Sequence, residues 1–345
     1  MAERIIVAGG AGYIGSHVCV ELLEAGKSVL VIDNFSNSSP EALARIEEIA
    51  SGKIEFLEAD LANPADTDKV VAAVSAFKPD GAVHLAGLKA VGESVAEPMR
   101  YYAVNLGATV TLLKALDAAN ARLIVFSSSA TVYGDRNKSP VTEDNATGPT
   151  NPYGRTKYFI EEMLRDQVRA DPRWKACNLR YFNPVGAHAS GKIGEDPNGI
   201  PNNLFPFIAQ VAVGRREKLS VFGKDYPTKD GTGVRDYIHV VDLAKGHVKA
   251  LDYLAKEEAP GAVDVNLGAG VGYSVLEAIA AFKRASNRDI PYEIAPRRDG
   301  DIAEIYADAK RAKELFGWKA EKTLEDMCAD HWRWQRENPD GYGRT

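Results

Sequence analysis

The stretch Arg4-Ile5-Ile6-Val7-Ala8-Gly9-Gly10-Ala11-Gly12-Tyr13-Ile14-Gly15 joins a short apolar run to a loop rich in glycine. The run at residues 4–8 predicts a β-strand, and residues 16–24 have the periodicity of a helix. The glycines between them satisfy both G-x-G-x-x-G, from Gly10, and G-x-x-G-x-x-G, from Gly9. Glycines there let the backbone turn tightly and approach a pyrophosphate at a helix N-terminus. The order strand, glycine loop, helix therefore predicts the start of a dinucleotide-binding unit.

The next predicted strand, at residues 28–32, ends in an acidic residue. Asp33 follows it, 18 residues after Gly15. A carboxylate there can accept hydrogen bonds from the adenosine ribose hydroxyls and would repel a 2′-phosphate. We therefore expect NAD rather than NADP. The alternative is a structural glycine turn with a solvated aspartate.

Strands and helices continue to alternate after Asp33. Apolar runs at 53–57, 81–86 and 122–127 predict strands, and residues 98–119 predict a long helix. Residues suited to ligand binding follow the strands: Asp60-Leu61, which could flank an adenine, Gly87, and Ser127-Ser128-Ser129. This order predicts an α/β protein with a Rossmann-type doubly wound parallel sheet, whose binding crevice lies at the carboxyl ends of the strands.

A second motif, Asn151-Pro152-Tyr153-Gly154-Arg155-Thr156-Lys157, opens another predicted helix. Tyr153 and Lys157 are four residues apart, so on a helix they share one face. An ammonium group there favours the phenolate of a neighbouring tyrosine, which makes Tyr153 a candidate acid/base. In isolation, the same spacing also fits a surface tyrosine and lysine on a solvated helix.

Ser129 lies 24 residues before Tyr153, at the end of a predicted strand. Its hydroxyl and Tyr153 can both face the crevice over the glycine loop. Ser129, Tyr153 and Lys157 then form a hydride-transfer set. Tyr153 is the base, Ser129 bonds the reacting oxygen, and Lys157 tunes Tyr153 and holds the nicotinamide ribose.

The character of the chain changes after a predicted strand at residues 176–181. Residues 187–206 are rich in glycine, proline and asparagine, which is typical of a ligand loop. Mixed helices and strands follow. We expect an NAD-binding Rossmann domain at residues 1–184. A smaller mixed α/β substrate domain should follow at 185–345, with some elements interwoven with the first.

Composition excludes several classes of function. The net charge of −6 provides no basic surface for nucleic acid or an anionic membrane, and no apolar run approaches about 18 residues. The N-terminus shows no signal-peptide pattern. The three cysteines, Cys19, Cys177 and Cys328, are far apart and predict reduced core thiols in a cytoplasmic protein. The six histidines lack metal-ligand spacing, so we expect no catalytic metal.

Besides these motifs, several longer segments of the sequence resemble a known family. Residues 9–17, 86–94, 127–134, 180–188 and 233–239, together with the Tyr153/Lys157 pair, resemble the extended short-chain dehydrogenase/reductase superfamily. Within it, they are similar to the UDP-glucose 4-epimerases, and the resemblance covers nearly the whole chain. It implies interconversion of UDP-galactose and UDP-glucose in galactose metabolism, through a transient 4-keto sugar and tightly bound NADH. It also implies a homodimer that pairs the helices at 98–119 and 153–168.

The resemblance also implies roles for individual residues. The position of Ser129 bonds the sugar 4-hydroxyl, Tyr153 is the base, and Lys157 steers both. The implied cofactor-binding residues are Gly9, Gly12, Tyr13, Ile14, Gly15, Asp33, Asn34, Asn37, Ser38, Asp60, Leu61, Leu85, Ala86, Gly87, Lys89, Asn105, Ser129, Tyr153, Lys157 and Phe182. The implied substrate-binding residues are Lys89, Ser129, Tyr153, Tyr181, Asn183, Asn203, Arg235, Arg298, Asp301 and Ile305.

Two of these substrate positions carry additional chemical meaning. A guanidinium fork suits a diphosphate better than an ammonium group does, which agrees with Arg235 and Arg298. Without the resemblance, both would more often be surface ion pairs. Ile305 is implied to gate the hexose 2-substituent, and its bulk predicts exclusion of N-acetylated sugars.

Two alternatives remain. A sugar-nucleotide 4,6-dehydratase needs an additional acid and base, and in dehydratases an Asp-Glu pair follows the threonine of the strand-end motif. Here Thr131 is followed by Val132. A non-catalytic NAD-binding regulator commonly lacks the tyrosine and lysine, whereas this chain keeps Ser129, Tyr153 and Lys157.

Overall fold

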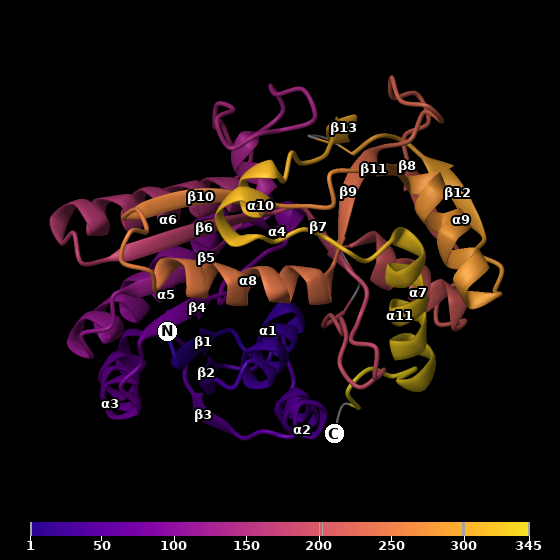
Figure 1. Ribbon diagram of the computed structural model, residues 1–345. Helices are drawn as coiled ribbons and strands as arrows, with labels where there is room; N and C mark the ends of the chain where they lie inside the picture. The colour runs from indigo at the N-terminus through magenta and orange to yellow at the C-terminus, as the bar shows by residue number, and fades with distance from the viewer. Residues whose placement is uncertain (1, 200, 202, 299–300, 344–345) are drawn as a thin grey trace.

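A computed structural model describes residues 2–199, 201, 203–298 and 301–343 (Figure 1). Its largest sheet has seven strands in the order β10-β6-β5-β4-β1-β2-β3, and every neighbouring pair is parallel. The strands are β1 (Arg4–Ala8), β2 (Ser28–Asp33), β3 (Ile54–Glu58), β4 (Gly81–His84), β5 (Leu123–Ser129), β6 (Lys175–Tyr181) and β10 (Ala262–Leu267). The predicted doubly wound parallel sheet is confirmed.

Apolar side chains on both faces explain why helices cover both sides of this sheet. On β1, Ile5 and Val7 join one core and Ile6 and Ala8 the other, since successive side chains in a strand point to opposite faces. The first face packs on α1 (Tyr13–Glu24), α2 (Pro40–Ala50), α8 (Val240–Leu254) and α10 (Lys310–Phe316). The second packs on α3 (Thr67–Phe77), α5 (Pro98–Ala118) and α6 (Pro152–Ala170).

A smaller unit lies to one side of the sheet (Figure 1). One of its sheets consists of β7 (Asn183–Val185), β9 (Val234–His239), β11 (Gly272–Ser274) and β13 (Glu304–Ile305), and another pairs β8 (Leu219–Phe222) with β12 (Tyr292–Ala295). Its helices are α7 (Leu204–Ala212), α9 (Val275–Ser286) and α11 (Leu324–Glu337). Capping boxes start α9 at Ser274 and α11 at Thr323, and both helices contribute to one apolar core.

We call the seven-stranded sheet with its helices the first unit and the smaller one the second unit. The chain returns to the first unit after it has entered the second. Helix α8 packs on α1, and β10 pairs with β6 at the edge of the large sheet. Both elements follow residue 184, so the two units share the later part of the chain. A division at residues 184 and 185 stays a prediction.

The remaining elements of the first unit are a short helix, α4 (Val91–Ala96), and two 3₁₀ turns, at Pro64–Asp66 and Ala130–Tyr133. Cys19, Cys177 and Cys328 are buried and unpaired, as predicted for core thiols. Within the described residues, every helix is too short or too polar to cross a lipid bilayer.

Candidate active site

The glycine loop between β1 and α1 is built so that its backbone can be approached closely. Gly9 has φ +81°, and a Cβ there would lie 2.8 Å from the amide nitrogen of Ala86. A Cβ on Gly15 would lie 2.1 Å from the carbonyl oxygen of Gly9, which packs the loop on the helix. At Gly12 a Cβ would meet only that same oxygen, at 3.4 Å. The loop is therefore closed on the protein side and open over Gly12, where the first turn of α1 begins.

Asp33 ends β2 and ties the neighbouring loops together. Its Oδ2 accepts the amide of Ala11 at 3.0 Å, and its Oδ1 accepts the amide of Phe35 at 2.9 Å and the hydroxyl of Ser38 at 2.8 Å. A carboxylate offers about four acceptor positions, so Asp33 retains capacity for one more donor. The loop continues through the exposed Asn34 and Asn37, and Asn37 Oδ1 accepts the amide of Asn198 at 3.3 Å.

The loop after β4 is held from the opposite side. Leu85 and Ala86 lead to Gly87, which has φ +150°. Asn105 of α5 accepts the amide of Leu88 at 2.8 Å and donates to the carbonyl of Leu88 at 3.1 Å and to Thr156 Oγ1 at 3.0 Å. Asn105 therefore connects this loop to α6, the helix that carries Tyr153 and Lys157.

Ser129, Tyr153 and Lys157 meet at the carboxyl end of β5. Asn151 caps α6 by accepting the amide of Gly154 at 2.8 Å, which places Tyr153 in the first helical turn. The ammonium nitrogen of Lys157 lies 5.8 Å from the centroid of the Tyr153 ring and donates to the carbonyl of Ser127 at 2.6 Å. Ser129 Oγ accepts from the amide and hydroxyl of Thr131, at 3.2 and 3.0 Å.

The surroundings of Tyr153 and Lys157 disfavour a lone phenolate on Tyr153 and a lone ammonium on Lys157. Desolvation raises the pKa of the partly buried Tyr153, and a hydrogen bond with Ser129 acts in the opposite direction. Burial lowers the pKa of Lys157 to about 7. An ammonium next to a phenolate stabilises both charges, so the pair is suited to exchange protons near neutral pH.

The adjacent serines, Ser127 and Ser128, have contacts within the protein. Ser128 Oγ donates to Glu161 Oε1 at 2.6 Å, and Glu161 forms a buried ion pair with Arg180 at 2.7 Å. Ser127 contributes the carbonyl that binds Lys157.

The predicted substrate residues of the second unit form two groups. In the first, Arg235 of β9 donates from Nη2 to Asp301 Oδ1 at 3.1 Å. The guanidinium of Arg298 stacks 3.8 Å from the ring centroid of Phe222. Ile305 pairs in register with Arg235 and packs beside the buried cluster that contains Phe182.

The second group centres on a residue that was not predicted. Glu195 Oε1 accepts from Lys89 Nζ at 3.3 Å and from Asn203 Nδ2 at 2.9 Å. Lys89 follows β4, and Asn203 stands immediately before α7 without a side-chain hydrogen bond to that helix, so the carboxylate joins predicted residues of both units. Asn183 is exposed on β7.

Other predicted residues have contacts within the protein. Tyr13 donates its hydroxyl to the carbonyl of Gly186 at 2.8 Å, and Ile14 beside it is partly buried. Asp60 Oδ1 accepts the amide of Ala62 at 2.8 Å, and Leu61 is buried in the core. Tyr181 pairs in register with Ser129, and its hydroxyl bonds His247 Nε2 in the core beneath α8.

Comparisons with known proteins find close relatives over nearly the whole chain. The sequence model of the family described as GDP-mannose 4,6 dehydratase matches residues 6–331. The UDP-glucose 4-epimerase of Bacillus subtilis (strain 168) is 58% identical over 338 residues, 98% of each chain. The human UDP-glucose 4-epimerase is 54% identical over 350 residues, 99% of each chain. The chain belongs to the UDP-glucose 4-epimerase family.

The fold is also similar to that of solved UDP-glucose 4-epimerase structures. The crystal structure of the UDP-glucose 4-epimerase from Bifidobacterium longum, in complex with NAD+ and UDP, has a TM-score of 0.93 and 51% identity. The match covers 98% of this chain and 99% of that chain. In this UDP-glucose 4-epimerase family member, the open side of Gly12 and the spare acceptor capacity of Asp33 are compatible with NAD at the glycine loop.

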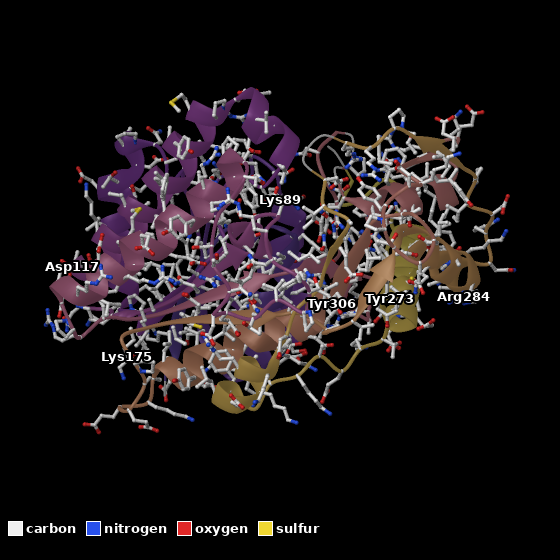
Figure 2. The ribbon with its side chains drawn as sticks, turned by 90° about the horizontal axis from the view of Figure 1, so that it is seen from above. Lys89, Asp117, Lys175, Tyr273, Arg284 and Tyr306 are labelled. Atoms are coloured by element: carbon white, nitrogen blue, oxygen red, sulfur yellow. The ribbon has the colours of Figure 1, made fainter. Side chains whose placement is uncertain are left out.

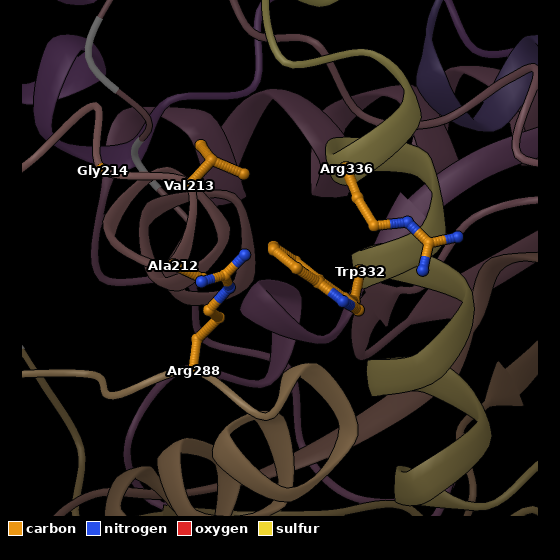
Figure 3. Close-up of a pocket in the computed structure, with 6 residues that line it drawn as sticks. All are labelled: Ala212, Val213, Gly214, Arg288, Trp332 and Arg336. Carbon is orange, nitrogen blue, oxygen red and sulfur yellow. The ribbon is translucent and has the colours of Figure 1, made fainter.

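Two further observations concern other parts of this family member. Among the described residues, no three or more His, Cys, Asp or Glu side chains gather as a metal site. A surface depression of about 400 Å³ is lined by Ala212, Val213, Gly214, Arg288, Trp332 and Arg336, which Figure 3 draws as sticks. None of these is a predicted site residue, and the depression lies apart from the Ser129–Tyr153–Lys157 group.

Sequence reasoning missed Glu195 and the contact of Asn105 with Thr156. Glu195 stands in the loop rich in glycine, proline and asparagine, which was predicted to contact a ligand. That composition was the available signal, but it does not single out one carboxylate. Residues 89 and 195 are 106 positions apart, so no local pattern joins them.

Proposed function

We propose that this protein is an NAD-dependent UDP-glucose 4-epimerase that interconverts UDP-galactose and UDP-glucose. The observation that supports it best is the arrangement of Ser129, Tyr153 and Lys157 at the carboxyl end of β5, two strands along the sheet from β1 and its glycine loop. Relatives named UDP-glucose 4-epimerase match the chain over nearly its full length. That name describes an isomerase of a nucleotide sugar.

In this proposal, Tyr153 takes the proton of the sugar 4-hydroxyl and later returns one to the same oxygen. Ser129 holds that oxygen with its hydroxyl, and Lys157 stabilises the phenolate through its charge. When bound, NAD would accept the hydride from C4 and return it to the opposite face. The sugar must therefore turn within the site while its nucleotide remains bound.

The nucleotide would be held by the second unit. Arg235 and Arg298 offer guanidinium groups suited to the diphosphate and ribose, and Asn203, Asn183 and Asp301 offer hydrogen bonds. The Arg235–Asp301 ion pair keeps one guanidinium oriented at 3.1 Å. Holding UDP there leaves the hexose between Arg235 and Tyr153, next to Ile305.

The proposal includes a homodimer formed through α5 and α6 in a cytoplasmic protein. Apolar side chains are exposed on both helices: Met99 is 70% exposed, Val110 40% and Phe159 42%. Exposed apolar groups on neighbouring helices mark an interaction surface. Light scattering that gives a monomer would contradict the dimer. The unpaired cysteines support a reducing compartment.

The test is a conversion assay. Purified protein is mixed with UDP-galactose without added NAD, and UDP-glucose is followed by chromatography. Turnover supports the epimerase. Absence of turnover in protein that retains NAD would leave the regulator, and a dehydrated 4-keto-6-deoxy sugar would indicate the dehydratase. The dehydratase is disfavoured because Val132 follows Thr131, where that chemistry needs a carboxylate pair.

A further inference from the structure

Glu195 is a buried carboxylate that bonds two side chains of the proposed site. The residue is 5% exposed, and its Oε1 accepts from Lys89 Nζ at 3.3 Å and from Asn203 Nδ2 at 2.9 Å. A buried charge is costly unless it is paired and hydrogen-bonded, and here both conditions are met. Lys89, whose side chain is 49% exposed, lies at the border between the two units (Figure 2).

The backbone around Glu195 is held rigidly by distant parts of the chain. We call residues 186–198 the connecting loop. Trp334 Nε1 of α11 donates to the carbonyl of Glu195 at 3.3 Å, and the Tyr342 hydroxyl accepts the amide of Gly194 at 3.3 Å. From the first unit, Arg45 of α2 donates to the carbonyl of Lys192 at 2.9 Å.

These contacts fix the backbone of Glu195, and its side chain is directed at the site. Lys89 has a long, flexible side chain, and an ammonium without a fixed partner samples many rotamers. Asn203 has a donor that needs an acceptor to fix its orientation. One anchored carboxylate oxygen restricts both at once.

We propose that Glu195 is a positioning residue that orients Lys89 and Asn203 for binding the UDP end of the substrate. The inference rests on the proposed function for the identity of that ligand. Glu195 acts through its two partners and does not itself touch the reacting atoms.

The first experiment compares two neighbouring carboxylates of the connecting loop. Glu195→Gln keeps the shape and an acceptor for Asn203 but removes the charge that holds Lys89. Asp196→Asn removes the same charge from the next residue, whose Oδ2 accepts the amide of Tyr342 at 3.0 Å instead. Calorimetric titration of UDP into NAD-loaded protein should show a Kd increased about tenfold in Glu195→Gln. Asp196→Asn should stay within about twofold of the wild type.

The second experiment is a double-mutant cycle with Lys89→Met. If Glu195 acts through Lys89, Glu195→Gln should weaken UDP binding much less in the Lys89→Met background than in the wild type. In steady-state kinetics, KM should rise more than kcat falls. Circular dichroism and NAD content identify any variant that fails to fold. In that case Glu195→Asp, which keeps the charge on a shorter side chain, replaces it in the comparison.

Three outcomes would overturn the inference: unchanged UDP affinity in Glu195→Gln, tighter UDP binding because a freed Lys89 binds phosphate better, or an equal effect of Glu195→Gln in both backgrounds. UDP titration needs no turnover. A protein that binds UDP in this Glu195-dependent way without epimerising would therefore refute the proposed function and leave the inference standing.

Discussion

The chemistry proposed at the residue scale depends on Tyr153 and Lys157 sharing a desolvated site. Desolvation raises the pKa of Tyr153, and burial lowers the pKa of Lys157 to about 7. Each group alone therefore favours its neutral form. The arrangement is productive because a proton moved from the phenol leaves a phenolate beside an ammonium, and the two charges stabilise each other.

Removing the Tyr153 hydroxyl tests the proposed base directly. Tyr153→Phe should lower kcat by about 10²- to 10⁴-fold, the usual contribution of a positioned acid/base group. The conversion of UDP-galactose measures the loss. Tyr253→Phe, which removes a hydroxyl from α8 where the ring packs on Phe316, is the matched control and should retain activity. Near-normal turnover in Tyr153→Phe would refute the assignment.

Replacing Lys157 tests how the phenolate is favoured. Lys157→Met removes the positive charge near Tyr153, so the pKa of Tyr153 should rise further. Because the phenolate is the active form of the base, the acid limb of the kcat/KM profile should move to higher pH. A pH–rate profile of both proteins measures the shift. A lower activity with an unchanged profile would mean that Lys157 acts only by binding.

Ile305 tests the width of the sugar pocket. It pairs with Arg235 and packs beside Phe182, and its β-branched side chain is stiff. An N-acetyl group against it should overpack the pocket by about 1–3 kcal/mol, which is roughly 5- to 150-fold in efficiency. UDP-N-acetylglucosamine should therefore be a poor substrate beside UDP-glucose, and Ile305→Ser should improve it. Equal efficiency in the wild type, or no gain in the variant, would contradict this role.

At the element scale, the β1–α1 junction separates two uses of glycine. Gly15 is needed for the helix to pack on its own loop, because a Cβ there would lie 2.1 Å from the Gly9 carbonyl oxygen. Gly12 faces open space, where a Cβ meets only that oxygen at 3.4 Å. One glycine serves the fold, and the other leaves room for a ligand.

Two alanine variants should separate these uses. Gly15→Ala should lower the melting temperature of the protein, because backbone must move to relieve the contact. Gly12→Ala should keep the melting temperature of NAD-free protein near that of the wild type but weaken retention of NAD, since the methyl group occupies the approach to the helix N-terminus. Melting curves and NAD released on denaturation measure the two effects. Wild-type NAD retention in a folded Gly12→Ala protein would contradict the proposed cofactor position.

At the scale of the whole molecule, buried neutral histidines couple stability to pH. Burial lowers the pKa of His17 and His84 to about 3, and of His247 and His331 to about 4. Unfolded histidine titrates near 6.5, so the unfolded chain binds more protons from about pH 6.5 down to about pH 4 for His247 and His331, and down to about pH 3 for His17 and His84. The contribution of these neutral histidines to the free energy of unfolding is fully present above that range, and it is lost as the pH falls through it. Glu21 and Asp236, whose pKa values burial raises to about 7 and 6, oppose the trend in part.

A substitution of His331 measures the contribution of one such histidine. His331 lies 6.2 and 6.0 Å from the rings of Phe205 and Phe282, in the core of the second unit. In His331→Leu, the free energy of unfolding should fall less steeply with acid, by about 1.4 kcal/mol per pH unit between about pH 6 and 4.5. Urea titrations at several pH values measure the slope. Parallel curves for the two proteins would show that His331 already titrates normally when folded.

The order of strands and helices in the first unit could be predicted from the sequence because local signals specify it. The run before Gly9 has the length of a strand, the glycines mark the turn, and Asn151-Pro152 starts the helix of Tyr153. These signals act over a few residues, where chain geometry alone decides which side chains are neighbours. The same short range explains why Tyr153 and Lys157 were predicted to share one helix face.

Contacts between distant segments were decided only by the tertiary structure. Strand β10 joins the first sheet beside β6, although strands β7, β8 and β9 of the second unit lie between β6 and β10 in the sequence. Tyr181 turns to His247 in the core, and Glu195 meets Lys89 across 106 positions. Periodicity cannot indicate such pairs, because they depend on how whole elements pack and on which buried charge must find a partner. The sequence therefore determined the chemistry available at the ends of the strands, and tertiary packing decided which distant side chains hold that chemistry in place.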